Sequence, residues 1–237
     1  MPDLRQRHCE PELMDDLALD PAAHAEALRG LSRLNWISGS AGVLWRPIAA
    51  LSRRHRGGPL RVLDVATGGG DVPVALWRLA RANGCALEID GCDRSATAVA
   101  NARERAQRLG AAIRFIQLDV LDQELPAGYD VVMSSLFFHH LTEPQIARML
   151  AGMAAASRQL VLVNDLVRSA WTWCAAWLGS RALTRSPVVR IDSLRSVRAA
   201  LTLPELRAVA ARAGLSSADV RWQWPCRALL SWSRHDA

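Results

Sequence analysis

A glycine-rich turn between an apolar segment and a helical pattern is the feature that most constrains the fold of this chain. The segment reads Val62-Leu-Asp-Val-Ala-Thr-Gly-Gly-Gly-Asp71, in which a buried strand ends near Asp64 and a helix begins near Asp71. Glycines let the backbone approach a ligand closely, and the N-terminus of the following helix faces the same crevice. Because open α/β sheets bind ligands at the carboxyl ends of their strands, this turn predicts a ligand-binding site.

Two carboxylates beside the turn bear on the kind of ligand. The dinucleotide pattern G-x-G-x-x-G is incomplete, because Gly68 and Gly70 are followed by Pro73 where the third glycine should stand. Asp64 and Asp71 would repel a pyrophosphate and suit a cationic cofactor. The turn therefore favours a positively charged ligand over a dinucleotide.

Short apolar segments alternate with helical patterns along most of the chain. This alternation predicts a mostly parallel sheet covered by helices on both faces. Helices are expected over 71–82, after Ser95 as far as Gly110, and after two S/T-x-x-E/Q capping boxes that begin at Thr142 and Thr202. The expected strands are 61–65, 86–92, 113–118, 129–134, 160–164, 220–224 and 227–232.

The domain organisation follows from where this alternation starts and stops. Residues 1–58 are expected to form an N-terminal helical cap, with one helix opening at Asp20-Pro21 and another from about Gly42. Residues 59–237 are expected to form the α/β domain. The apolar and then basic stretch over about 166–201 interrupts the alternation and predicts a helical insertion after the fifth strand.

The basic residues are all arginines, and the absence of lysine excludes several kinds of chemistry. The chain has 29 basic residues against 23 acidic ones and a formal net charge of +6. A Schiff-base lysine, a Walker-type phosphate loop and lysine-assisted, metal-dependent catechol methylation are excluded. The positive charge indicates either a nucleic-acid or membrane partner or simply an arginine-rich composition, and the second interpretation is favoured.

The number of cysteines and the length of the apolar stretches indicate the cellular compartment. Five cysteines without a C-x-x-C pair, and a charged N-terminus without an apolar core, suggest reduced thiols in the cytoplasm. The apolar stretch over 170–179 is too short to span a bilayer, although it allows peripheral membrane contact. No metal-ligand motif is found in the sequence.

The glycine turn resembles that of the class I S-adenosylmethionine-dependent methyltransferases. The segment LDVATGGGD is most similar to the quinone-biosynthesis C-methyltransferases and related small-molecule methyltransferases, and the resemblance covers about residues 60–165. The family pattern D-x-G-x-G-x-G corresponds here to Asp64, Ala66, Gly68 and Gly70, so Ala66 replaces the first glycine.

The resemblance implies further cofactor-binding residues at the ends of the next two strands. Asp93 corresponds to the acidic residue that holds the ribose hydroxyls. Asp119 corresponds to the residue beside the adenine amino group, and Val120 offers a backbone N–H. The full predicted set is Asp64, Ala66, Thr67, Gly68, Gly70, Asp71, Asp93, Arg94, Asp119, Val120 and Ser134.

The segment after the fourth strand bears on the substrate class. Ser134-Ser-Leu-Phe-Phe-His-His-Leu141 lacks the Asn/Asp-Pro-Pro-aromatic motif of enzymes that methylate nucleobase or amide nitrogens. His139 and His140 are expected near the methyl group, where a neutral imidazole can accept a proton from a phenol or enol. His140 is preferred over His139, with packing of one histidine under the helix as the alternative. Asp165, after the fifth strand, is a further candidate base or hydrogen-bond acceptor.

The acceptor is expected between the insertion and the N-terminal helices. Arg168 is predicted to hold a phenolate or carboxylate, or else to pair with Asn164 or Asp165 across the turn. Trp171, Trp173 and Trp177 are predicted to form an apolar lid, with core packing or a dimer contact as the alternative. Asn35 and Trp36 are predicted to close the other side of the pocket.

These features together predict S-adenosylmethionine-dependent O-methylation of a small, largely apolar aromatic, polyketide-like or phenolic acceptor of secondary metabolism. C-methylation of a quinone or phenol ring remains an alternative. An RNA methyltransferase, a non-catalytic cofactor-binding regulatory protein and a nicotinamide-dependent reductase are further alternatives. A cytoplasmic monomer or homodimer is expected.

Overall fold

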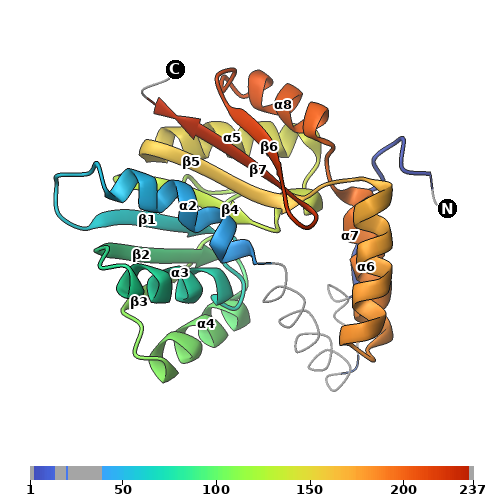
Figure 1. Ribbon diagram of the computed structural model, residues 1–237, viewed down its shortest axis with the longest axis horizontal. Coiled ribbons are helices and arrows are strands. Elements are labelled where there is room, and N and C mark those ends of the chain that lie inside the picture. Colours follow the sequence, from blue (N-terminus) through green and yellow to red (C-terminus); the bar gives the residue numbers. More distant parts are fainter. Residues whose placement is uncertain (1–2, 14–19, 21–38, 235–237) are drawn as a thin grey trace.

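The computed structural model describes residues 3–13, 20 and 39–234, and its centre is one seven-stranded sheet (Figure 1). The strand order is β3-β2-β1-β4-β5-β7-β6, and β7 runs antiparallel to both of its neighbours. This confirms the predicted mostly parallel sheet. The strands are β1 (Leu60–Val65), β2 (Leu87–Asp93), β3 (Ile113–Gln117), β4 (Tyr129–Ser135), β5 (Ser157–Leu166), β6 (Asp219–Gln223) and β7 (Arg227–Ser233).

Helices cover both faces of the sheet. On one face, Leu44 and Ile48 of α2 pack against Val62 and Leu162 of the central strands. On the other face, Ile146 and the rest of the apolar side of α5 join the larger hydrophobic cluster. The helices are α2 (Ser40–Ser52), α3 (Asp71–Ala82), α4 (Ala96–Arg108), α5 (Glu143–Ala156), α6 (Ala170–Leu183), α7 (Pro187–Ala199) and α8 (Leu203–Arg212), with a 3-10 turn, η2 (Phe138–His140).

Local capping explains why the helices begin where the sequence indicates. The Ser95 side chain accepts a hydrogen bond from the backbone N–H of Ala98 at the start of α4. Reciprocal capping boxes, begun by Thr142 and Thr202, open α5 and α8. Each box satisfies backbone N–H groups that have no partner within the helix, so these starts are readable from short sequence motifs.

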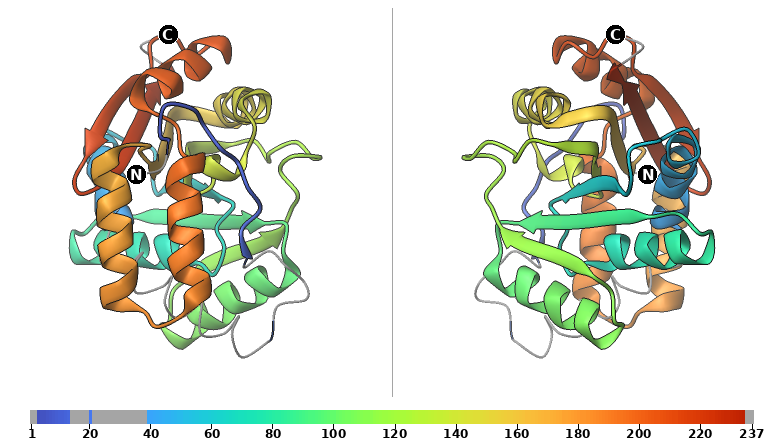
Figure 2. Two further views of the ribbon diagram at one scale, coloured as in Figure 1. Left: turned by 90° about the vertical axis from the view of Figure 1, so that its right-hand side faces the viewer. Right: turned by 90° about the vertical axis from the view of Figure 1, so that its left-hand side faces the viewer.

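The predicted helical insertion after the fifth strand is confirmed as α6 and α7. The two helices stand side by side beyond the carboxyl ends of β4 and β5 (Figures 1 and 2). Residues 3–13 run along α7, where the His8 N–H donates to the carbonyl of Arg198 and the Leu13 N–H donates to Asp192. The beginning of the described chain therefore lies at the carboxyl edge of the sheet.

The N-terminal part of the chain is only partly described. The helix expected to open at Asp20-Pro21 lies outside the described residues. The second expected helix is α2, which packs on the sheet as part of the α/β core. Among the described residues, no helix has the length and apolar character needed to cross a membrane.

The helix α6 has an unusual distribution of side chains. It buries the polar residues Thr172 and Ser180, while Trp171, Trp177 and Leu178 are exposed. Amphipathic surface helices usually show the reverse arrangement. The exposed apolar side of α6 is consistent with contact to an apolar molecule.

Candidate active site

Carboxylates at the ends of β1 and β2 hold the glycine turn in place. The Thr67 hydroxyl donates to Asp64 Oδ2 at 2.6 Å, and the Gly68 N–H donates to Asp93 Oδ2 at 2.9 Å. The other carboxylate oxygen of Asp93 accepts a hydrogen bond from the Ser95 N–H at 2.9 Å. Asp93 therefore ties the turn after β1 to the N-terminus of α4.

Backbone conformation explains where glycine is needed in the turn. Gly70 has φ of 73°, and a Cβ atom there would lie 3.0 Å from the Ala102 Cβ and 3.1 Å from the Phe115 ring. Gly68 is also left-handed, with φ of 55°, but a Cβ there would meet nothing within 4 Å. Gly70 is therefore required for close packing, and Gly68 borders open space.

Ala66, which stands where the family pattern has a glycine, adopts a left-handed backbone conformation. Its φ is 56°, in the left-handed region that an L-residue enters at a cost of roughly 1–2 kcal/mol. The turn keeps this conformation although the residue is not glycine. Neighbouring contacts, including the hydrogen bond from the Thr67 N–H to the Cys92 carbonyl at 2.9 Å, hold the chain here.

Asp64 is a buried carboxyl group that lacks one hydrogen-bond partner. Its Oδ2 accepts from Thr67, but its Oδ1 has no partner among the described residues. Burial raises the pKa of Asp64 to about 7, against the hydrogen bond from Thr67, and the nearby charge of Asp93 adds to the rise. A buried acceptor without a donor is rare in folded proteins, so Asp64 Oδ1 is a position where a bound ligand could donate a hydrogen bond.

A surface cleft lies beside this turn, past the ends of β2 and β3. Asp119 lines this cleft, and its Oδ1 accepts a hydrogen bond from the Leu121 N–H at 3.0 Å. Predicted cofactor residues Arg94 and Asp119 therefore face the same opening. The cleft is lined by Arg94, Ser95, Gln117, Leu118, Asp119, Asp122 and Gln123.

Two other predicted cofactor residues make contacts within the protein. The Asp71 carboxylate forms an ion pair with Arg105 of α4 at 2.5 Å. The Ser134 hydroxyl is buried and donates to the Val65 carbonyl at 3.0 Å. Ser134 therefore ties β4 to the strand that carries the glycine turn.

His139 and Asp165 form a buried pair near the carboxyl ends of β4 and β5. His139 Nδ1 lies 2.7 Å from Asp165 Oδ1, and the His139 N–H donates to Asp165 Oδ2 at 3.1 Å. Burial opposes the charged imidazole, but the charge and hydrogen bond of Asp165 hold the pKa of His139 above its usual value. Burial likewise opposes the charged carboxylate, and His139 holds the pKa of Asp165 below its usual value.

His140 lies directly beside this pair and is exposed. The two imidazole rings have centroids 4.2 Å apart. Desolvation by the surrounding protein, and then the charge of His139, lower the pKa of His140 to about 4. The charges of Glu12 and Asp165 oppose this lowering of the pKa, and the charge of Arg94 adds to it. The structure therefore brings the three predicted catalytic residues together.

Arg168 has a different environment from the one expected of an acceptor-binding residue. Its guanidinium donates to the carbonyls of Leu4 at 3.0 Å and Ala200 at 2.6 Å, and pairs with Glu205 at 2.5 Å. The side chain is only 1% exposed. Arg168 therefore joins the N-terminal segment, α7 and α8, and the local sequence alone does not distinguish this role from substrate binding.

The predicted aromatic lid divides into exposed and partly buried side chains. Trp171 is exposed, and its indole N–H donates to the Pro225 carbonyl at 2.9 Å, whereas Trp173 is partly buried. Trp171 also contacts Trp224, which contacts Trp222, with ring centroids 6.1 Å apart in both pairs. Asn35 and Trp36 lie outside the described residues.

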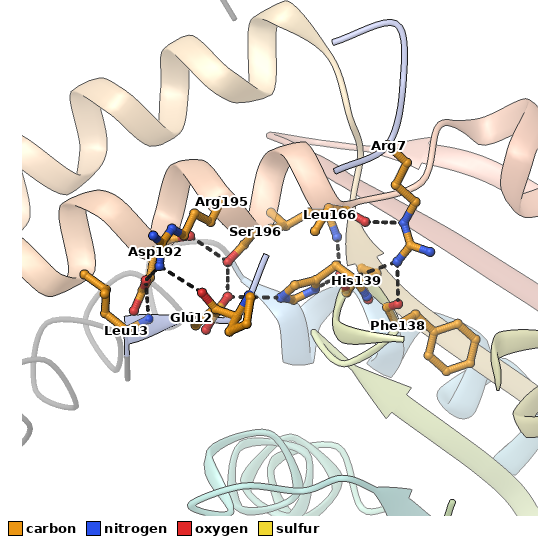
Figure 3. Close-up of polar contacts among 12 residues, drawn as sticks. Arg7, Glu12, Leu13, Phe138, His139, Leu166, Asp192, Arg195 and Ser196 are labelled. Atoms are coloured by element: carbon orange, nitrogen blue, oxygen red, sulfur yellow. Dashed lines mark hydrogen bonds and ion pairs between the residues drawn. The ribbon is translucent and has the colours of Figure 1, made fainter. Parts of the chain in front are cut away.

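The N-terminal segment brings residues to the site that the sequence pattern does not indicate. Glu12 Oε1 lies 3.9 Å from His139 Nε2, whereas Asp165 contacts the other ring nitrogen, Nδ1 (Figure 3 shows Glu12 and His139). Arg7 donates to the carbonyls of Phe138 and His139, at 3.2 Å each. These contacts join residues far apart in sequence, and a polar N-terminal stretch carries no local motif that would reveal them.

Known proteins share this fold and part of this sequence. Residues 62–159 match the family described as methyltransferase domain. A demethylmenaquinone methyltransferase of Thermus thermophilus is 33% identical over 135 residues, which are 56% of this chain and 58% of that protein. The chain therefore matches only a little over half the length of this relative.

Solved structures extend the similarity of fold beyond that segment. The apo form of the S-adenosylmethionine-dependent methyltransferase SibL aligns with a TM-score of 0.67 and 21% identity, over 96% of this chain and 63% of that chain. An O-methyltransferase family 2 protein from Planctomyces limnophilus, in complex with apigenin, has a TM-score of 0.63 and 18% identity, over 92% of this chain and 63% of that chain. The sheet order and these solved structures show that the chain has the fold of S-adenosylmethionine-dependent methyltransferases, and its residues 62–159 match a methyltransferase domain.

Proposed function

We propose that this protein transfers the methyl group of S-adenosylmethionine to a hydroxyl group of a small, largely apolar phenolic or polyketide-like acceptor. The observation that carries the cofactor proposal is the set of carboxylates after β1, β2 and β3. Asp64 and Asp93 accept hydrogen bonds from Thr67 and Gly68 of the glycine turn, and Asp119 lines the neighbouring cleft. They lie at the edge where ligands of α/β sheets bind.

The residues present fit this cofactor in charge and hydrogen bonding. Asp64 Oδ1 is a buried acceptor without a donor among the described residues, and the cofactor's ammonium group would supply one. Asp93 keeps free lone pairs for two ribose hydroxyls, because each carboxylate oxygen accepts more than one hydrogen bond. Asp119 and the backbone of Val120 are assigned to adenine. When bound, the cofactor supplies a methyl group on positively charged sulfur.

The acceptor hydroxyl is assigned to the polar group formed by His139, His140 and Asp165. These side chains follow β4 and β5, and β4 pairs directly with β1, so they share an edge with the glycine turn. Methyl transfer to a hydroxyl releases one proton, and this group of imidazoles and a carboxylate is where the proton is accepted. The protein's main contribution is to hold the acceptor oxygen in line with the methyl group.

The apolar part of the acceptor is assigned to the side formed by α6. Trp173 is partly buried in this helix, and Trp171 is exposed near its start. An apolar cover excludes water and holds a hydrophobic ring. The structural relative crystallised with apigenin supports an O-methylation reaction. We place the reaction in the cytoplasm, in agreement with five free cysteines.

C-methylation of a quinone or phenol ring is the second candidate, supported by the 33% identity to a demethylmenaquinone methyltransferase. The two reactions are distinguished by incubating the protein and isotope-labelled cofactor with small-molecule extracts and synthetic phenols. Mass spectrometry and NMR then locate the labelled methyl group on oxygen or carbon. Cofactor binding without transfer to any acceptor would instead favour a regulatory cofactor-binding protein.

Substitution of Asp93 tests the cofactor site directly. Charge-assisted hydrogen bonds are worth about 1.5–3 kcal/mol, so Asp93→Ala should weaken S-adenosylmethionine binding by about 10-fold to 100-fold in calorimetry. Glu88→Ala is the matched control, because Glu88 lies on the same strand and its side chain is 64% exposed. Unchanged affinity in Asp93→Ala would contradict the assigned cofactor site.

A further inference from the structure

Three side chains, two of them in the candidate active site, have the composition of a metal site. Glu12, His139 and His140 each offer one ligand atom, and these atoms all lie within 4.8 Å of one another. Glu12 comes from the N-terminal segment, whereas both histidines belong to η2 after β4. Two imidazoles and one carboxylate form a ligand set known from catalytic zinc sites.

The distance between Glu12 and His139 fits a shared ion better than a direct hydrogen bond. Glu12 Oε1 and His139 Nε2 are 3.9 Å apart, which exceeds hydrogen-bonding distance. Zinc binds imidazole nitrogen and carboxylate oxygen at about 2.0–2.2 Å, so two ligands on one ion lie roughly 3–4 Å apart. Both atoms are largely enclosed, since the His139 and Glu12 side chains are 6% and 14% exposed.

Surrounding groups orient both of these ligands. Asp165 engages His139 Nδ1 at 2.7 Å, which leaves Nε2 directed toward Glu12 (Figure 3). A carboxylate on the far nitrogen of a ligating histidine is a common outer partner in metal sites. On the other side, the Ser196 hydroxyl donates to Glu12, and Arg195 donates to the Pro11 carbonyl at 2.8 Å. The N-terminal segment is thus held against α7 with its carboxylate facing the imidazole.

We propose that Glu12, His139 and His140 bind one divalent transition-metal ion, with zinc as the best match. Imidazole ligands suit zinc and similar ions, whereas magnesium and calcium prefer sites made of oxygen atoms. Three protein ligands leave a fourth tetrahedral position open. His140 is exposed, and its ligand atom lies within 4.8 Å of those of Glu12 and His139.

The position of this site gives the ion a role in the proposed reaction, and that role rests on the proposed function. The open position lies where the acceptor hydroxyl is assigned, so the ion would bind that oxygen and favour its ionised form. In the balanced step, the O–H bond breaks, and its proton goes to solvent instead of to the imidazoles, because both imidazoles are then bound to the ion. One O–CH₃ bond forms, and the methyl–sulfur bond breaks with its electron pair passing to sulfur.

Metal binding is tested on the full chain after treatment with EDTA. Calorimetric titration with Zn²⁺ should give one site per chain, and Co²⁺ should give the visible absorption of a tetrahedral complex. Glu12→Gln and His140→Ala should each weaken Zn²⁺ binding by at least about tenfold, and Asp165→Asn by about 10-fold to 100-fold as an outer partner. Glu10→Gln is the matched control, because Glu10 lies in the same segment but pairs with Arg195 and Arg198.

Two results would overturn the metal site. One is Zn²⁺ affinity that Glu12→Gln and His140→Ala leave unchanged. The other is a near-ultraviolet thiolate band in the Co²⁺ complex, which would assign the ion to the free cysteines. Asp93→Ala separates the two proposals, since it should reduce cofactor affinity and leave Zn²⁺ binding intact. Calorimetry with S-adenosylhomocysteine checks that the ligand variants remain folded.

Discussion

At the scale of single residues, Ala66 shows how a departure from a family pattern affects backbone energy. The sequence correctly indicates that Ala66 stands where the family has glycine, and the structure places it at φ of 56°. The left-handed conformation costs an L-residue roughly 1–2 kcal/mol, and a glycine would avoid this cost. A glycine would also add about 0.4–1 kcal/mol of conformational entropy to the unfolded chain, which offsets part of that benefit. Alanine at this position therefore retains a modest strain.

Replacing Ala66 by glycine tests that strain. Ala66→Gly should raise the free energy of unfolding by up to about 1 kcal/mol, measured by urea denaturation. Ala100→Gly, at an exposed position in α4, is the control and should lower it by about 1 kcal/mol. Equal destabilisation by both substitutions would show that Ala66 is not strained.

The buried carboxyl group of Asp64 makes cofactor binding depend on pH. Its pKa is about 7, and a cationic ligand favours the ionised form, so protonation should compete with S-adenosylmethionine. Affinity should rise by about tenfold between about pH 6 and pH 8. Calorimetry at several pH values measures this rise, and Asp64→Asn should abolish it. A wild-type profile as flat as that of the variant would rule out the coupling.

The raised pKa of Asp64 makes the stability of the ligand-free protein fall with rising pH, whereas cofactor affinity rises. Asp64 binds its proton more tightly when folded than when unfolded, where an aspartate titrates near 3.9. Its contribution to stability is therefore fully present below about pH 4 and is lost as pH rises through about 7. Cofactor binding and ligand-free stability thus respond in opposite directions.

At the scale of helices and strands, the sequence predicts elements better than it predicts contacts between them. Asp71–Ala82 is a helix with the predicted bounds, and both capping boxes open helices as expected. Such signals depend on neighbouring residues. The roles of Glu12 and Arg168 depend on segments that meet only in the folded chain, so periodicity and spacing do not reveal them.

Substitution of Arg168 tests whether its side chain holds helices and the N-terminal segment together or binds the substrate. Arg168→Ala removes hydrogen bonds to Leu4, Ala200 and Glu205 and should lower the free energy of unfolding by about 2–3 kcal/mol. Affinity for S-adenosylhomocysteine should remain unchanged. Chemical denaturation and calorimetry measure the two quantities. A normal unfolding energy together with an increased KM for the acceptor would restore the substrate-binding interpretation.

At the scale of the whole molecule, many arginines bond to backbone carbonyls instead of forming one basic surface. Arg103 donates to Phe115, Arg148 to Leu121 and Arg207 to Val220, each to the carbonyl oxygen. These contacts come from α4, α5 and α8, which lie on different parts of the sheet. The net charge of +6 is therefore spread over the fold.

This distribution predicts weak binding to nucleic acid. Non-specific complexes typically have Kd values of about 10⁻⁴–10⁻⁶ M near physiological salt, and we expect a short single-stranded RNA to fall in that range or above it. Fluorescence anisotropy over a series of salt concentrations measures the affinity and its salt dependence. Nanomolar binding with a steep salt dependence would favour an RNA methyltransferase.

The exposed tryptophans near α6 also have a spectroscopic consequence. Trp171, Trp222 and Trp224 are 54%, 45% and 69% exposed and form one chain of ring contacts. Indoles in water emit at longer wavelengths than indoles shielded from it. An acceptor or partner that covers this group will therefore shift the protein's fluorescence toward the blue, which allows its binding to be followed without any attached label.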